Sequence, residues 1–235
     1  MKLEYHNGVR ITKHLHEMTP FEAAVQNYEK MAKDYFSSSR NLTDEKRQAA
    51  CDKALADLEC EKKKINTLAS IESQLQQYRE QGTKATEGSL RDRAGALTMM
   101  QQEKHHPTEV LEKYMRAEGI PKPSPQHTAH HIVPGKGKLK AVTTNTRLHL
   151  HKHGIHITDP ANGVYLVCKD ADTPHWSMPA SRGHLKYHTH EYEQWMAQRV
   201  QRLNNMDMLK TQLQIIGRIL QSNEPKVAIQ AIKHC

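Results

Sequence analysis

The sequence contains no apolar stretch that approaches the ~18 residues needed to span a membrane. Hydrophobic residues occupy only 37% of its 235 positions, and the mean hydropathy is −0.81. The first residues, MKLEYHNGVRITKHLHEM, mix charged and apolar positions throughout, unlike the apolar segment of a secretory signal peptide. We therefore expect a modest apolar core and no membrane span, and any export would need a route that uses no signal peptide.

Cysteine is scarce and shows no pattern typical of a disulfide framework or a zinc site. The four cysteines are Cys51, Cys60, Cys168 and Cys235, and none belongs to a CxxC pair. This spacing favours reduced cytosolic thiols or small buried residues over a disulfide or a zinc ligand set.

Positive charge and histidine are concentrated in the second half of the chain. Residues 1–126 hold 20 Lys and Arg against 19 Asp and Glu, whereas residues 127–235 hold 14 against 7. A basic domain attracts polyanions, of which nucleic acid is the commonest, although a generally basic surface is an equal alternative. Of the 17 histidines, 11 lie between His127 and His190, a cluster that indicates metal or acid–base chemistry.

Helical periodicity dominates the first half, and we predict helices over residues 19–36, 43–81, 89–103 and 107–118. Thr19 is the expected N-cap of the first, while Gly82 and Gly119 are expected to end the second and the fourth. Three prolines in GIPKPSPQ (119–126) then favour an extended linker. We place a domain boundary there, which leaves residues 1–118 as a helical region whose role in delivery, adaptor binding or oligomerisation stays open.

The second half alternates short strands with helices. TAHHIV and VYLVC read as strands, and VTTNTRLHLHKHG reads as a helix closed by Gly154. The stretch from His184 to about Ser222 reads as one helix, with a last short helix from Pro225 to His234. On such a helix His184 and His188, four residues apart in HLKYH, would share one face and could bind one metal ion.

A set of motifs in residues 126–203 connects these histidines. They are Ala129-His130-His131 followed by IVPG, then DPANGVYL, then GH and H-HEY. This set resembles the HNH/endonuclease VII (ββα-metal) superfamily of nucleases, and within it the Ala-His-His (AHH) toxin family. The resemblance implies a mainly α fold with a small ββα-metal catalytic core in residues 127–235.

The resemblance also implies a role for each residue of the site. His130, His184 and His188 would bind the metal, His131 would be the general base, and Asn162 would steady the base or the metal site. Lys136, Lys138, Lys140 and Arg147 are expected phosphate contacts, with a solvated basic loop as the alternative. Because adjacent strand residues face opposite ways, His130 and His131 must lie where the strand ends or bends.

The chemistry explains why imidazoles suit such a site. Phosphodiester hydrolysis needs a deprotonated water, and an imidazole with a pKa near ~6.5 can accept that proton at neutral pH. A divalent cation can stabilise the departing oxygen. Imidazole ligands favour a transition metal such as zinc, nickel or manganese over magnesium, which prefers oxygen ligands.

We therefore expect a metal-dependent, largely sequence-nonspecific DNA endonuclease, with RNA as a further possible substrate. The family resemblance implies an antibacterial toxin or effector, neutralised by an immunity protein and located in the bacterial cytoplasm or delivered into a target cell. Residues 1–118 would then bind a secretion-system component or a chaperone. The alternatives are a non-catalytic, zinc-stabilised DNA-binding module and a housekeeping HNH nuclease of restriction or repair.

Overall fold

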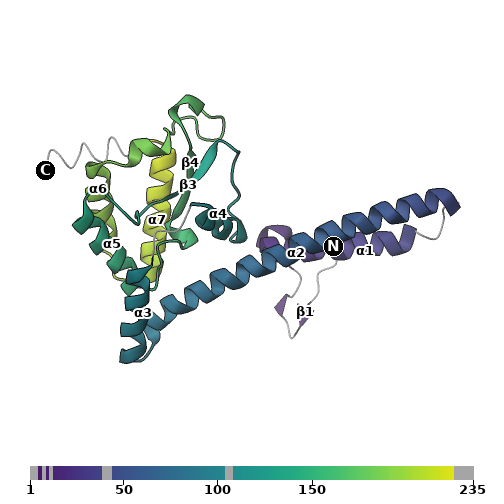
Figure 1. Cartoon of the computed structure of the whole chain (residues 1–235), viewed down its shortest axis with the longest axis horizontal. Helices are drawn as coiled ribbons and strands as arrows, with labels where there is room; N and C mark the ends of the chain where they lie inside the picture. The colour runs from purple at the N-terminus through teal and green to yellow at the C-terminus, as the bar shows by residue number, and fades with distance from the viewer. Residues whose placement is uncertain (1–4, 7–8, 11–12, 39–43, 104–107, 225–235) are drawn as a thin grey trace. The chain divides into compact units, whose positions relative to one another are not determined.

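The computed structural model describes residues 5–6, 9–10, 13–38, 44–103 and 108–224 (Figure 1). The chain forms two compact units: Met1–Ser73 with Ala117–Gly119, and Gln74–Arg116 with Ile120–Cys235. The fold is mainly α with one small sheet in the second unit, which confirms the predicted fold class. No helix among the described residues is both long and apolar enough to cross a membrane.

The first unit is built mainly from two helices. They are α1 (Pro20–Ser38) and the N-terminal part of α2 (Asp44–Glu87), preceded by the 3₁₀ turn η1 (Leu15–Glu17) and the paired strands β1 (Tyr5–His6) and β2 (Val9–Arg10). Thr19 begins α1 as predicted: its hydroxyl accepts from Glu22 N at 3.2 Å, and the Glu22 carboxylate accepts from Thr19 N at 3.0 Å. This reciprocal pair is a capping box.

The second unit contains the rest of α2 and a hairpin surrounded by helices (Figure 1). In chain order its elements are α3 (Leu90–Gln102), α4 (Thr108–Ala117), β3 (His127–His131), α5 (Lys140–Lys152), η2 (Pro160–Asn162), β4 (Gly163–Val167), η3 (Asp170–Asp172), η4 (His184–Tyr187), α6 (His190–Val200) and α7 (Met206–Gln221).

The β3–β4 hairpin separates two apolar clusters. The strands pair antiparallel, from His127 opposite Val167 to His131 opposite Gly163. Ala129 and Tyr165 pack with two residues of α4. Val164 and Leu166 face the other way and join the main core, which α6 and α7 complete with Trp195, Met196, Leu209, Leu213, Ile216 and Leu220. Because His130 is paired with Val164, the hairpin directs His130 to the α6 side.

The predicted helix over residues 184–222 is wrong, because this segment contains two helix starts. Thr189 caps α6 by accepting from Tyr192 N, and Asn205 caps α7 by accepting from Asp207 N and Met208 N. Before α6 the chain forms the short 3₁₀ turn η4. Such caps satisfy the free N–H groups of a helix start and so divide the segment. The helix predicted from Pro225 to His234 lies outside the described residues.

Gly82 does not end α2, which continues to Glu87. Its backbone instead lies against Gly154, where a Cβ on residue 82 would be 2.1 Å from the Gly154 oxygen. Gly154 has a φ of +74° and follows the end of α5, as predicted. Gly82 is therefore required for a close approach of two backbones rather than for a turn.

The compact units also differ from the boundary predicted at residues 119–126, because residues 74–116 pack with the hairpin unit. The Arg79 guanidinium donates to both carboxylate oxygens of Asp159, at 2.9 and 3.2 Å. Tyr78 Oη accepts from Thr158 N at 3.1 Å. A long polar helix gives no sequence signal for these contacts, since only the partners' positions in space define them.

We predict that Gly82→Ala lowers the free energy of unfolding by about 1–3 kcal/mol, because the added methyl group would displace the Gly154 backbone. The matched control is Gly95→Ala in α3, where a Cβ meets nothing within 4 Å. That change should raise stability by about 1 kcal/mol through helix propensity. Chemical denaturation checks both, and equal effects of the two substitutions would contradict the close approach.

Candidate active site

Three histidines gather on the α6 side of the hairpin. His130 comes from β3, His184 begins the η4 turn, and His188 follows the last residue of that turn, before α6. The ring centroids are 5.0 Å apart for His130 and His188, 6.0 Å for His184 and His188, and 6.4 Å for His130 and His184. The structure thus brings together the three predicted metal ligands, although His184 and His188 lie at the two ends of a short 3₁₀ turn rather than on one α-helix.

The η4 turn is held in place by the end of β4 and the loop that follows. Asp170 Oδ1 accepts from Gly183 N at 2.8 Å, directly before the turn. His184 Nδ1 lies 2.9 Å from the Cys168 carbonyl oxygen. Because a carbonyl only accepts, Nδ1 carries the proton, which leaves His184 Nε2 as the atom with a lone pair for a ligand.

His130 is buried, and its Nε2 has no hydrogen-bond partner within the described part of the chain. Burial lowers the pKa of His130 well below its usual value, and the charges of His188, His131 and His184 lower it further. The pKa of His188 is also lowered, first by burial, then by His184 and Lys138, against an opposing effect of Glu193. Both rings are thereby kept neutral, the form that binds a metal.

The donor set fits a transition metal by its chemistry, since all three candidates are imidazoles. Two imidazoles bound to one tetrahedral ion have ring centroids about 5 Å apart. His130 and His188 meet this spacing, whereas His184 is farther from His130. Accordingly, among the described residues no three His, Cys, Asp or Glu side chains are arranged to hold an ion as they stand.

His131 is buried and is the last residue of β3, after which the chain bends at Ile132 and Val133. The expected position at a strand end is therefore observed. Tyr192 of α6 secures the bend, because its hydroxyl donates to the Ile132 carbonyl at 2.8 Å.

Asn162 lies at the end of η2 and holds the segment that follows His131. Its Oδ1 accepts from Val133 N at 2.8 Å, and its Nδ2 donates to the carbonyls of Val133 at 3.0 Å and Ile157 at 2.7 Å. Asn162 is fully buried. These contacts orient the backbone beside the candidate base.

Residues 111–220 match the family model of AHH, described as a nuclease family of the HNH/ENDO VII superfamily with conserved AHH. This segment is an AHH nuclease domain. It contains the Ala129-His130-His131 motif, the hairpin and the η4 turn. No curated protein and no solved structure gives a significant match to the chain. This match supports a nuclease function, and nucleases of this superfamily generally use a divalent metal.

The four predicted phosphate contacts of the AHH domain differ in their surroundings. Lys136, Lys138 and Lys140 are exposed, and the Lys138 charge is close enough to lower the pKa of His188. Arg147 is half-buried, and its guanidinium donates to the carbonyls of Gly135 at 3.2 Å and Gln101 at 3.4 Å. Arg147 therefore ties α5 to the basic loop and to α3.

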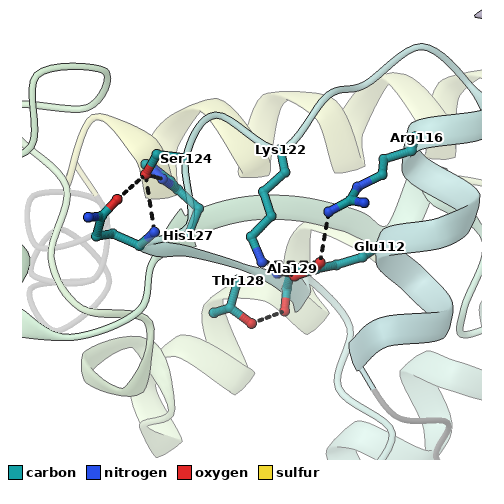
Figure 2. Close-up of polar contacts among 8 residues, drawn as sticks. Glu112, Arg116, Lys122, Ser124, His127, Thr128 and Ala129 are labelled. Carbon is teal, nitrogen blue, oxygen red and sulfur yellow. Dashed lines mark hydrogen bonds and ion pairs between the residues drawn. The ribbon is translucent and has the colours of Figure 1, made fainter. Parts of the chain in front are cut away.

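Away from its His130-His131 end, β3 is held by ion pairs and by hydrogen bonds to neutral groups. The sequence did not predict these contacts. Figure 2 shows Lys122 and Arg116 beside the Glu112 carboxylate, at 3.0 and 3.6 Å. Glu112 also accepts from Ala129 N at 3.3 Å. The two ring nitrogens of His127 lie 2.9 Å from Ser124 Oγ and 3.2 Å from Ser177 Oγ. These residues orient the strand that carries the motif.

We predict that the AHH domain loses stability in acid through His151, which is fully buried on α5. Burial lowers its pKa to about 4; the Glu103 carboxylate opposes this shift, and His156 and Arg147 add to it. Below pH ~6.5 the unfolded ring takes up a proton while the folded ring stays neutral, so stability falls as the pH drops toward 4. The full effect is about 3 kcal/mol.

Urea unfolding of the wild type and of His151→Phe between pH 7.5 and 4 tests this sign and size. The variant, which cannot titrate at this position, should show the shallower decline. An identical slope for both proteins would show that the His151 ring titrates alike in the folded and unfolded states.

Proposed function

We propose that this protein is a metal-dependent endonuclease that hydrolyses DNA phosphodiester bonds largely without sequence preference. The observation that carries the proposal is the gathering of His130, His184 and His188 next to His131 within an AHH domain. The three rings offer the nitrogen donors that a divalent ion needs, although they are not arranged to hold one as they stand, and the adjacent histidine can accept a proton. Hydrolysis of a phosphodiester needs both functions.

In this proposal His131 takes the proton from the attacking water. Its place at the end of β3 is secured by Asn162 and Tyr192, which bind the backbone of the next two residues, Val133 and Ile132. A base held in this way needs little reorganisation when substrate binds, because the surrounding hydrogen bonds already define the backbone.

His130, His184 and His188 would hold the metal, which would supply positive charge for the phosphate and the departing oxygen. Their lowered pKa values keep His130 and His188 available as ligands at neutral pH. The Cys168 carbonyl orients His184 with Nε2 as its free donor atom. Imidazole donors support zinc, nickel or manganese over magnesium.

The excess of positive charge in the second half of the chain supports a nucleic acid as the substrate. Residues 127–235 carry 14 Lys and Arg against 7 Asp and Glu. Lys136 and Lys138 are exposed on the loop before α5, and Lys140 is exposed at the first position of α5. These lysines would bind backbone phosphates, contacts that confer affinity without sequence preference. We favour DNA, and cleavage of RNA is the alternative that a direct comparison of substrates decides.

We further propose that the nuclease is an antibacterial effector with a cognate immunity protein, and that residues 1–118 connect it to a delivery partner. The support is the AHH family match, together with the compact helical unit that Met1–Ser73 forms within this region, whereas Gln74–Arg116 belong to the hairpin unit. A housekeeping nuclease of restriction or repair is the competing role. Growth arrest upon cytoplasmic expression would favour the effector.

We predict that His131→Ala lowers the turnover of plasmid DNA by about 10²–10⁴-fold, the range expected for loss of a general base. Gel assays with zinc, nickel, manganese and magnesium, on plasmid DNA and on RNA, measure the rates. His16→Ala, an exposed histidine of the first unit, is the matched control and should cleave like the wild type. Wild-type cleavage by His131→Ala would refute the role of this residue, and relief of growth arrest would support it.

We predict that His188→Ala weakens binding of the activating metal by at least about tenfold, because it removes one of the two rings at ligand spacing. Isothermal titration of zinc into the full chain measures the affinity. His190→Ala, an exposed histidine at the start of α6, is the matched control. Zinc binding that is unchanged in His188→Ala would remove this residue from the site, and zinc binding without any cleavage would favour a structural zinc module.

A further inference from the structure

The basic loop of residues 132–139, which joins β3 to α5, is anchored at both ends by adjacent residues of α6. At its start, the Tyr192 hydroxyl donates to the Ile132 carbonyl at 2.8 Å. At its end, the Glu193 carboxylate accepts from Lys138 N at 2.8 Å and from Leu139 N at 2.7 Å. The first turn of α6 therefore determines where this loop lies.

Glu193 acts as the cap of α5 from a different helix. Leu139 is the N-cap residue of α5 and cannot cap it with an apolar side chain. The Glu193 carboxylate, which is only 2% exposed, takes that place and also accepts from Thr143 Oγ1 at 3.3 Å. A negative charge at a helix N-terminus is favourable because the unpaired N–H groups there carry partial positive charge.

This contact leaves the Lys138 and Leu139 amides occupied. In many proteins the amides at a helix start bind phosphate. Here an internal carboxylate already accepts from these two. These two amides therefore do not offer a phosphate site, and the exposed lysines are the cationic groups of the loop that can bind one.

Gly137 allows the loop to lie closely on the carboxylate. A Cβ at this position would be 2.0 Å from Thr143 Oγ1 and 2.8 Å from Glu193 Oε2. Any other residue would push the loop away from α6. The hydrogen bonds from the loop to the buried Glu193 carboxylate therefore depend on the absence of a side chain at Gly137.

The anchored loop brings Lys138 to the candidate active site. Its backbone is bound by Glu193, and His188 lies just before the same helix. The Lys138 side chain remains exposed, and its amide is bound by the first turn of the helix that begins two residues after His188. The loop position therefore determines whether this ammonium group can meet a phosphate held near the histidines.

We propose that Glu193 is a positioning residue for substrate binding: its buried carboxylate holds the loop so that Lys138 binds a phosphate of the nucleic-acid backbone beside His188. This inference rests on the proposed function and deepens it. Glu193 does not touch the substrate itself. It acts through Lys138.

A double-mutant cycle on DNA affinity tests the coupling. Fluorescence anisotropy of a labelled DNA duplex, in chelator and at several salt concentrations, is measured for the full-length wild type, Lys138→Ala, Glu193→Gln and the double variant. Each single change should weaken binding by about five- to tenfold and reduce the salt dependence by about one phosphate contact. The double variant should be little weaker than either single variant, because both remove the same contact.

Lys136→Ala is the matched control, since it removes an exposed lysine of the same loop whose amide Glu193 does not bind in the described structure. Its effect should multiply with that of Glu193→Gln. Gly137→Ala is the second variant, in case Glu193→Gln does not fold. Gly137→Ala should also weaken DNA binding, and combining it with Lys138→Ala should weaken binding little more than either change alone. Circular dichroism and thermal unfolding verify that each variant is folded.

Fully multiplicative effects of Glu193→Gln and Lys138→Ala, or an unchanged salt dependence in folded Glu193→Gln, would overturn the positioning role. The measurement is independent of cleavage, because it is made in chelator. If the wild type cleaves plasmid DNA but the effects of Glu193→Gln and Lys138→Ala multiply, the positioning role of Glu193 is refuted and the nuclease proposal stands. If the two effects do not multiply and the wild type cleaves neither DNA nor RNA, the positioning role of Glu193 is supported while the nuclease proposal is refuted.

Discussion

The antiparallel pairing of β3 and β4 is the constraint on which the candidate site depends. This register places Ala129 opposite Tyr165, toward α4, and His130 opposite Val164, toward α6. A slip by one residue would exchange the two faces and bury His130 among the α4 contacts. The apolar residues on both faces therefore define the direction of His130, the candidate metal ligand, because their burial disfavours other registers.

Short connections then complete the site around this hairpin. The Cys168 carbonyl and the Asp170 carboxylate hold the η4 turn, while Asn162 and Tyr192 hold the bend after His131. Each of these contacts has a backbone group as one of its two partners. Because a backbone group is positioned by its whole element, the geometry of the histidines reflects the packing of the unit more than any single side-chain pair.

The fold was largely predictable wherever a signal is local. Thr19 as a cap, Gly154 after a helix, and two short β-rich strands all follow from residue preferences, and the structure has each of them. Gly82 was misread because a helix-ending glycine and a glycine required for backbone contact look alike in sequence. The segment from His184 was misread because apolar periodicity continues across the caps at Thr189 and Asn205.

The sequence by itself determined which chemical groups the candidate site offers: the Ala129-His130-His131 motif, the two downstream histidines and a basic second half are local facts that any fold would carry. The tertiary structure alone decided the geometry. It showed that Arg79 and Tyr78 belong with the hairpin unit, that Arg147 binds backbone carbonyls, and that Glu193 caps a helix distant in sequence. Such contacts join residues that are distant in sequence and close only in the folded chain. The local sequence around a buried carboxylate or a helical arginine is the same whichever partner the side chain binds, so it cannot predict that partner.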